Sequence, residues 1–505
     1  MSNLHAQEKM IVFLTDKNQK SAIVFSERSE MRRTKNNVEI DSKDIPVSKN
    51  YIDALSADGQ ILNESRWLNA ITIETNLSVE ELQLKHEFID HIWTIKNGQS
   101  TQPRKDLIDL NAQKAFDYGN ADTQVRQINA NCLHDLGYTG IGVYLAVIDA
   151  GFKGMDTITY FDSIYLENRV IDKYDFINNT TDVYDFSSHG TAVSSCIFAE
   201  KLGPNAHIGT AVDVDIALYV SEDASSETLI EEFNLVVALE RCDVQGVDVA
   251  NISLGYLGFD DPSEDHVYND LDGVTTIAAI GVNTAASKGI VVVTSAGNSG
   301  PSTISTPCDA DSCLCVGAID GIGNYAPFSS VGPSADGQIK PDVVAMGKEA
   351  WVVIDDGQLV SGNGTSFSSP VMAGAVACLI QANPTATVEV IIQSIRENAN
   401  QFLAPDEFIG YGIPDFCSAN DFLEIDGLSQ NKLVSYPNPT AGKVIIKGVN
   451  NIKANEVQII NILGASVVAK ISVISNQLHI DLSPSPSGIY FCKINGNIIR
   501  IVKKD

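Results

Sequence analysis

The sequence predicts an α/β fold in which helices cover both faces of a parallel sheet, with a small α+β domain before it and a small β-sandwich after it. Between residues 121 and 425, apolar strands alternate with helices, which is typical of such a sheet. Residues 8–97 mix short strands and helices, and in 426–505 short strands follow one another across turns. A length of 505 residues fits about three domains.

The composition is that of a globular protein and argues against some classes of partner. Hydrophobic residues make up 44% of the chain and charged residues 19%, a balance that supports packed cores. The net charge of −30 argues against binding nucleic acid through a basic face. No apolar run approaches the ~20 residues that a membrane helix needs, so no membrane span is expected.

Residues 1–7 are expected to be a leader. No secretory apolar segment occurs in the sequence, but His5-Ala6-Gln7 resembles the tail of a signal peptide whose hydrophobic part is missing here. A short disordered leader is the alternative interpretation.

The segment 8–97 predicts a small α+β domain. Ser78 and Glu81 form the capping-box pattern that opens a helix. The expected elements are a strand at 10–14, a helix at 46–55 after a charged loop, a strand at 66–74, a helix from Ser78 and a strand at 89–95.

Residues 98–120 predict an exposed linker. The segment is polar and contains Pro103 and the basic pair Arg104-Lys105. Proteolytic nicking concentrates in such segments, so we expect a maturation cut within it.

The segment 121–425 carries the predicted parallel sheet, and 426–505 the sandwich. Sheet strands are expected at 143–148, 216–220, 247–254, 290–296, 313–319 and 343–344, with helices such as 226–242 and 275–288 between them. Sandwich strands are expected at 443–447, 456–462, 477–480 and 489–493.

Ser366 lies in a stretch of glycines and hydroxyl residues that runs into an apolar helix at 371–380. Pro370 fits the first turn of that helix, which places Ser366 at its mouth. Free N–H groups and the helix dipole favour negative charge there, as a serine that attacks a carbonyl requires. The alternative is a serine-rich helix cap.

Two further stretches favour the nucleophile. Asp149 ends a buried strand, and His189 begins a helix of small residues. Side chains at strand ends and helix starts can converge above one parallel sheet. Taken singly, Asp149 could cap a turn and His189 could be a core or capping histidine.

With these three motifs in the order Asp, His, Ser, the chain resembles the subtilisin-like serine proteases. It is most similar to secreted Bacteroidetes members that carry an N-terminal propeptide and a C-terminal sorting domain. The resemblance implies an inhibitory propeptide at 8–97. The stretch 436–440, the stretch 487–490 and the Lys503-Lys504 end resemble type IX secretion sorting domains, with a carbohydrate-binding or adhesion sandwich as the alternative.

The resemblance assigns roles to the candidate residues. Ser366 is expected to be the nucleophile, His189 the general base and Asp149 the group that orients the imidazole. Asn298, in Ser295-Ala296-Gly297-Asn298, matches the side-chain donor of the oxyanion hole. A turn residue in the left-handed conformation is its alternative interpretation.

The resemblance also implies a substrate channel that pairs with an extended peptide. Its expected residues are Ser253, Leu254, Gly255, Ser295, Ala296 and Gly297. No bulky or charged residue occupies these segments, so we expect a broad preference for apolar side chains. The acidic residues between Asp260 and Asp272 are interpreted as a solvated loop, with a calcium site or a preference for basic substrates as alternatives.

The nine cysteines cannot all pair within one chain. Cys308 and Cys313 are candidates for a local disulfide. Several of the other seven lie in apolar stretches and are interpreted there as buried free thiols. No spacing indicates structural zinc.

These observations predict a secreted or cell-surface serine endopeptidase made as a zymogen. Its partners are peptide and protein substrates, its own propeptide and the type IX secretion machinery, and its chemistry requires no cofactor. A catalytically silent surface adhesin on the same scaffold is the alternative. An esterase of another α/β fold would carry a G-x-S-x-G elbow, which does not occur around Ser366.

Overall fold

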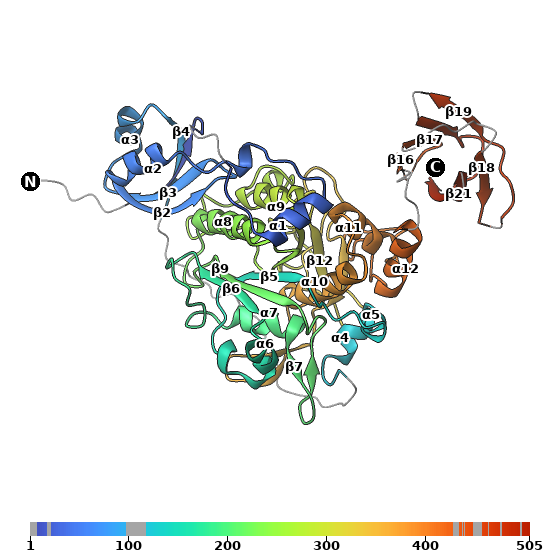
Figure 1. Cartoon of the computed structure of the whole chain (residues 1–505), viewed down its shortest axis with the longest axis horizontal. Helices are drawn as coiled ribbons and strands as arrows, with labels where there is room; N and C mark the ends of the chain where they lie inside the picture. Colours follow the sequence, from blue (N-terminus) through green and yellow to red (C-terminus); the bar gives the residue numbers. More distant parts are fainter. Residues whose placement is uncertain are drawn as a thin grey trace, which may run out of the picture. The chain divides into compact units, whose positions relative to one another are not determined.

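The computed structural model divides the chain into two compact units, residues 1–423 and 424–505, and each is described by itself (Figure 1). The structure describes residues 8–17, 22–96, 118–427, 434–436, 438, 440–447, 457–462, 464–474, 477–494 and 497–504. The predicted leader and most of the predicted linker lie outside these ranges.

A parallel sheet of seven strands forms the centre of the first unit (Figure 1). In sheet order the strands are β13 (Val343–Met346), β12 (Leu314–Ile319), β11 (Val291–Ser295), β10 (Val249–Ile252), β5 (Tyr144–Asp149), β9 (Asp215–Val220) and β6 (Val170–Asp175). Of these, β6 was not among the predicted strands. It is one of the two edge strands and carries charged residues, so its sequence lacks the apolar run that revealed the others.

Helices cover both faces of this sheet, as predicted. In β5, Leu145 and Val147 face a core shared with α7 (His189–Phe198) and α10 (Thr365–Ala382). The alternate residues Tyr144, Ala146 and Ile148 face a second core shared with α8 (Leu229–Gln245) and α9 (Ile277–Ser287). The two pairs of helices therefore lie on opposite sides of the sheet (Figure 1).

The remaining elements of residues 118–427 lie around this sheet. The helices are α4 (Asp122–Gln127), α5 (Ala130–Asp135), α6 (Asp162–Leu166), α11 (Val388–Glu397) and α12 (Phe416–Gly427), with single 3₁₀ turns at Met155–Thr157, Thr159–Phe161 and Tyr268–Asp270. Two short antiparallel pairs join β7 (Glu200–Lys201) to β8 (His207–Ile208) and β14 (Ala350–Val353) to β15 (Leu359–Gly362).

Helix α10 is long and apolar enough to cross a membrane by length and composition alone. However, 89% of its residues are buried inside the unit. It contacts β10, β11, β12, β13 and α7, so in this structure it is the central core helix of one face.

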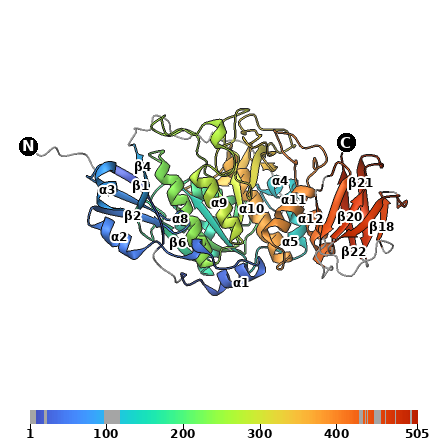
Figure 2. The same cartoon turned by 90° about the horizontal axis from the view of Figure 1, so that it is seen from above.

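The N-terminal domain is an antiparallel sheet of four strands with helices on one face. In sheet order the strands are β2 (Gly59–Ser65), β3 (Ala70–Thr75), β1 (Glu8–Leu14) and β4 (Ile89–Ile95). The helices are α1 (Glu27–Lys35), α2 (Lys49–Ser56) and α3 (Val79–Lys85), with a 3₁₀ turn at Ser42–Asp44. Helices α2 and α3 pack on the sheet, and its other face packs on α8 (Figures 1 and 2).

Three details of this domain differ from the sequence prediction. The strand expected at 66–74 begins only at Ala70, because the residues before it form a turn in which Asn69 has a φ of 51°. Helix α1 was predicted as a charged loop, because its buried side chains include arginines and no apolar residues. Strand β2 was missed because its residues are mostly polar.

The second unit is a β-sandwich of two antiparallel sheets, as predicted. One sheet has the order β16 (Val434–Tyr436), β17 (Lys443–Lys447), β20 (Gln477–Asp481) and β19 (Lys470–Ile474); the other has the order β18 (Val457–Asn461), β21 (Gly488–Ile494) and β22 (Asn497–Lys503). Alternate residues such as Val444, Ile480 and Ile501 form the core between the sheets.

The disulfides differ from the sequence prediction. Cys308 pairs with Cys315 rather than with Cys313, whose Sγ instead turns into the loop, 3.4 Å from Cys308 O. A second disulfide joins Cys132 in α5 to Cys417 in α12, across 285 residues, and no local sequence pattern predicted it. The free cysteines in the described residues are all buried: Cys196, Cys242, Cys313, Cys378 and Cys492.

His207 makes the stability of this fold sensitive to acid. The side chain is fully buried, its Nε2 lies 3.1 Å from Ser195 O, and burial lowers its pKa from 6.5 to about 4. Below pH 6.5 the unfolded chain takes up a proton that the folded one does not. The contribution of neutral, buried His207 to the free energy of unfolding is therefore fully present above pH 6.5 and is lost as the pH falls toward 4.

We expect wild type to lose about 3 kcal/mol more stability than a His207→Gln variant between pH 7 and pH 4. Urea unfolding of both chains at the two pH values measures the difference. Parallel pH curves for the two chains would contradict the assignment.

Candidate active site

Asp149 and His189 meet at the carboxyl edge of the sheet. Asp149 is the last residue of β5 and is completely buried, and its Oδ1 lies 2.7 Å from Nδ1 of His189, the first residue of α7. Oδ1 also accepts a bond of 2.8 Å from the N–H of Ala150. A buried carboxylate on Nδ1 fixes the imidazole tautomer and stabilises its cation, which leaves Nε2 available for proton transfer.

Gly190 lets the two side chains approach each other. A Cβ at this position would lie 2.4 Å from the carbonyl oxygen of Gly151, just past the end of β5. The N–H of Gly190 donates to that same oxygen at 2.9 Å. Because only glycine fits, the start of α7 sits directly against the turn that follows Asp149.

Ser366 is the second residue of α10, which begins at Thr365. Pro370 therefore lies in the second turn of the helix, not in the first turn as the sequence suggested. Since proline has no N–H, the carbonyl of Ser366 lacks its usual helical donor. The Oγ of Ser253 takes that place at a distance of 3.0 Å and ties the start of α10 to the end of β10.

The amide of Asn298 is oriented by Thr365. Asn298 Oδ1 accepts bonds from the Thr365 N–H at 2.9 Å and from Thr365 Oγ1 at 3.0 Å. The backbone N–H can only donate, so the oxygen must face Thr365 and the NH₂ group points away from it. Asn298 lines the cleft, where such a donor could stabilise an oxyanion.

A cleft of about 1260 Å³ joins these residues. Its lining includes His189, Ser366 and Asn298, so the structure brings the last two candidates to the same hollow as the Asp149–His189 pair. Of the residues expected to bind substrate, Ser253, Leu254, Gly255, Ser295 and Gly297 line the cleft. Ala296 does not line it, because its side chain is buried in the core shared with α8 and α9.

Residues beyond the predicted substrate-binding set also line the cleft. Thr365 orients Asn298, and its position directly before Ser366 was the only signal for it. The ring of Phe367 also lines the cleft, with its centroid 6.4 Å from that of His189. Glu222, Glu227 and Asp260 add negative charge to the wall, and no Lys or Arg is among the described residues that line it.

The acidic loop beside the cleft uses its carboxylates to hold its own turns. Asp265 accepts from the N–H of Phe259, Asp270 from that of Val267 and Asp272 from that of Val274. Among the described residues, no three His, Cys, Asp or Glu side chains are grouped so that they could hold a metal ion.

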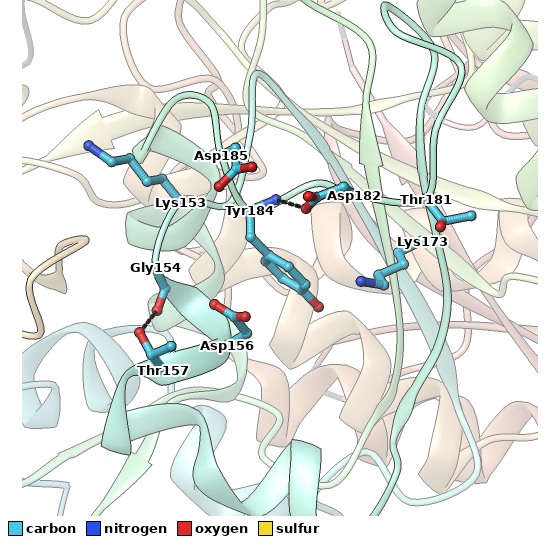
Figure 3. A pocket seen from close by; sticks show the side chains of 9 residues that line it. All are labelled: Lys153, Gly154, Asp156, Thr157, Lys173, Thr181, Asp182, Tyr184 and Asp185. Atoms are coloured by element: carbon cyan, nitrogen blue, oxygen red, sulfur yellow. Dashed lines mark hydrogen bonds between the residues drawn. The ribbon is translucent and has the colours of Figure 1, made fainter.

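A second hollow of about 600 Å³ lies near the β5–α7 connection (Figure 3). Lys153, Asp156, Lys173, Asp182 and Asp185 contribute charges of both signs to its lining. Lys173 lies 4.3 Å from the ring centroid of Tyr184. None of the candidate catalytic residues lines this hollow.

Comparisons with known families agree with this geometry. Residues 140–412 match the model of the subtilase family, peptidase S8, and the chain therefore belongs to that family. Residues 9–108 match the peptidase S8 propeptide domain of Bacteroidota, and residues 434–504 match a secretion system C-terminal sorting domain. The chain is thus a serine endopeptidase with a propeptide and with the sorting signal for export by type IX secretion.

Individual relatives cover the same region. The chain is 31% identical over 295 residues to subtilisin from Bacillus pumilus, which covers 57% of this chain and 94% of the relative. Subtilisin E from Bacillus subtilis (strain 168) is also 31% identical over 295 residues, covering 57% and 68%. The crystal structure of MycP1 from Mycobacterium smegmatis matches with a TM-score of 0.47 and 21% identity, covering 64% of this chain and 90% of that one.

Replacing Asn298 by Asp tests the oxyanion donor. The variant keeps the oxygen that binds Thr365 but loses the NH₂ group and adds a negative charge beside the developing oxyanion. We expect kcat on a peptide substrate to fall by at least about 10²–10³-fold with little change in KM; this range is the loss known for the corresponding donor of subtilisin itself.

Asn324→Asp, on an exposed loop that does not line the cleft, serves as the control and should retain full activity. A loss in Asn298→Asp that appears mainly in KM would contradict a role in the transition state.

Proposed function

We propose that the protein is a secreted serine endopeptidase, made as a zymogen, that hydrolyses peptide bonds through Asp149, His189 and Ser366. The observation that carries the proposal is the buried Asp149–His189 hydrogen bond at the edge of a cleft that Ser366 and Asn298 also line. No cofactor is required for this chemistry.

The proposed reaction has two halves. Ser366 Oγ attacks the scissile carbonyl while His189 Nε2 takes its proton, and the carbonyl oxygen becomes an oxyanion beside the Asn298 amide. The C–N bond then breaks as His189 returns the proton to the leaving amine, which gives an acyl-enzyme. Water, deprotonated by His189, attacks the ester, and the second product leaves as a carboxylic acid while Ser366 regains its proton.

The side chains that line the cleft favour some peptide substrates over others. Leu254, Leu257 and Phe259 line it on one side, which favours apolar substrate side chains. The carboxylates of Glu222, Glu227 and Asp260 disfavour acidic peptides by like-charge repulsion.

Zymogen formation is supported by where the N-terminal domain ends. The backbone N–H of Lys96 donates to Glu264 at 3.1 Å, and its ammonium group lies 2.6 Å from Ser263 Oγ. Both partners belong to the loop whose residues 257–260 and 262 line the cleft. The chain therefore leaves the N-terminal domain at the rim of the proposed active site, which suits a segment that is cut there.

Replacing Ser366 by Ala should abolish both activity and maturation. We expect casein digestion to fall to background, labelling by a fluorophosphonate to disappear, and the chain to remain uncut between its N-terminal and catalytic domains. Gel electrophoresis, mass spectrometry and labelling measure the three results.

Ser368→Ala is the matched control. Ser368 lies on the same helix and donates to Thr365 O at 3.0 Å, but it does not line the cleft. This variant should be labelled and should mature. If Ser366→Ala still digests casein, the proposed nucleophile is wrong.

A further inference from the structure

In addition to its contacts near the cleft, the N-terminal domain is attached to the catalytic domain far from the cleft, by the side chain of Arg32 in α1. Residues Ser226 and Glu227, which precede α8, line the cleft, whereas Arg32 binds the opposite end of that helix around Asp243. At 1.5 Å per residue, the length of α8 separates the two places by about 20 Å. Figure 2 shows α1 as a separate arm of the N-terminal domain.

The guanidinium of Arg32 is surrounded by acceptors of the catalytic domain. Its Nη1 lies 2.7 Å from Val247 O, and its Nη2 lies 3.1 Å from Asp243 O and 2.5 Å from Asp243 Oδ1. Its Nε donates to Lys288 O at 3.2 Å. The side chain of Arg32 is 1% exposed and that of Asp243 is fully buried, so these bonds are shielded from water.

The backbone of the catalytic domain supplies this site with negative potential. Asp243 lies in the last turn of α8, which ends at Gly246 in the left-handed conformation, and Lys288 caps the C-terminus of α9. Carbonyl groups in the last turn of a helix lack intrahelical donors, and the helix dipole is negative there. Carbonyl groups at two helix ends and one carboxylate thus surround the guanidinium group of Arg32. Its planar set of N–H donors has the geometry to bind these acceptors together.

Two more arginines of the N-terminal domain bind the same group of carboxylates. Arg33 Nη2 lies 2.5 Å from Asp44 and 2.7 Å from Asp243, and Arg66 bridges Glu240 and Asp243 at 2.9 Å each. Burial alone would lower the pKa of Arg33, but its hydrogen bonds to Asp44 and Asp243 raise it. Asp243 and Glu240 belong to the catalytic domain, so departure of the N-terminal domain removes all three guanidinium partners at once.

We propose that the ends of α8 and α9 form a guanidinium-binding socket, which Arg32 fills in the zymogen and which becomes free for arginine-like ligands after maturation. The socket anchors the N-terminal domain independently of the cleft. It follows that a cut in the linker does not by itself release the domain, and that a soluble guanidinium compound promotes release by competing with Arg32. The zymogen part of this inference rests on the proposed function.

The test uses the full chain in a Ser366→Ala background, with the recognition sequence of a specific protease inserted between Lys105 and Asp106. After the cut, we expect the two fragments to elute together in size-exclusion chromatography. Titration of the dissociation by dilution gives the dissociation constant. No catalytic activity is needed, so the result does not depend on whether the proposed function is correct.

Arg32→Met should weaken the association by about 10²-fold, because it leaves buried acceptors without a donor. Arg32→Lys should weaken it by at least about tenfold, since an ammonium group lacks the planar fork. Arg28→Ala is the matched control: this residue of the same helix makes an ion pair with Asp215 while its side chain is 43% exposed, and its loss should cost less than about fivefold.

Competition provides a second measurement on the unaltered interface. L-argininamide should release the N-terminal fragment, while L-lysinamide at equal ionic strength should leave it bound. An Arg32→Met effect no larger than that of Arg28→Ala, or equal release by the two amides, would overturn the socket. Thermal unfolding of each uncut variant verifies that it is folded, and the competition result stands even if Arg32→Met does not fold.

Discussion

The hydrogen bond between the buried Asp149 carboxylate and His189 Nδ1 is the interaction on which the rest of the site depends. It links the end of β5 to the start of α7 on one face of the sheet, and Gly190 removes the side chain that would keep them apart. The parallel sheet imposes the location, because the carboxyl ends of its strands meet at one edge. The residues after β10 and β11 reach the same edge and bring Ser253 and Asn298 with them.

Helix α10 reaches that edge through polar contacts at its first turn. Asn298 binds the N–H of Thr365, and Ser253 binds the carbonyl that Pro370 leaves without a helical donor. Each contact satisfies a backbone group that the helix itself cannot satisfy. The beginning of α10 is therefore held to two neighbouring strand ends, while its apolar remainder is fixed by the core.

Much of this arrangement could be predicted, because buried parallel strands are continuous apolar runs and the motifs around Asp149, His189 and Ser366 are local. What could not be predicted depends on contacts between distant segments. The edge strand β6 and helix α1 carry charges whose partners lie elsewhere in the chain, as Arg32 does with Asp243. The predicted position of Pro370 within the helix was wrong because the helix start is set by Asn298. The pairing of Cys308 with Cys315 depends on how a buried loop turns.

The disulfide between Cys132 and Cys417 closes a covalent ring around almost the whole catalytic domain, since the two cysteines lie near its two ends. All three candidate triad residues lie inside the ring. A single backbone break at any point between these cysteines converts the ring into an open chain but releases no piece. For a protein whose neighbours in solution are copies of the same protease, this connectivity means that one accidental cut by a neighbour cannot separate Ser366 from His189.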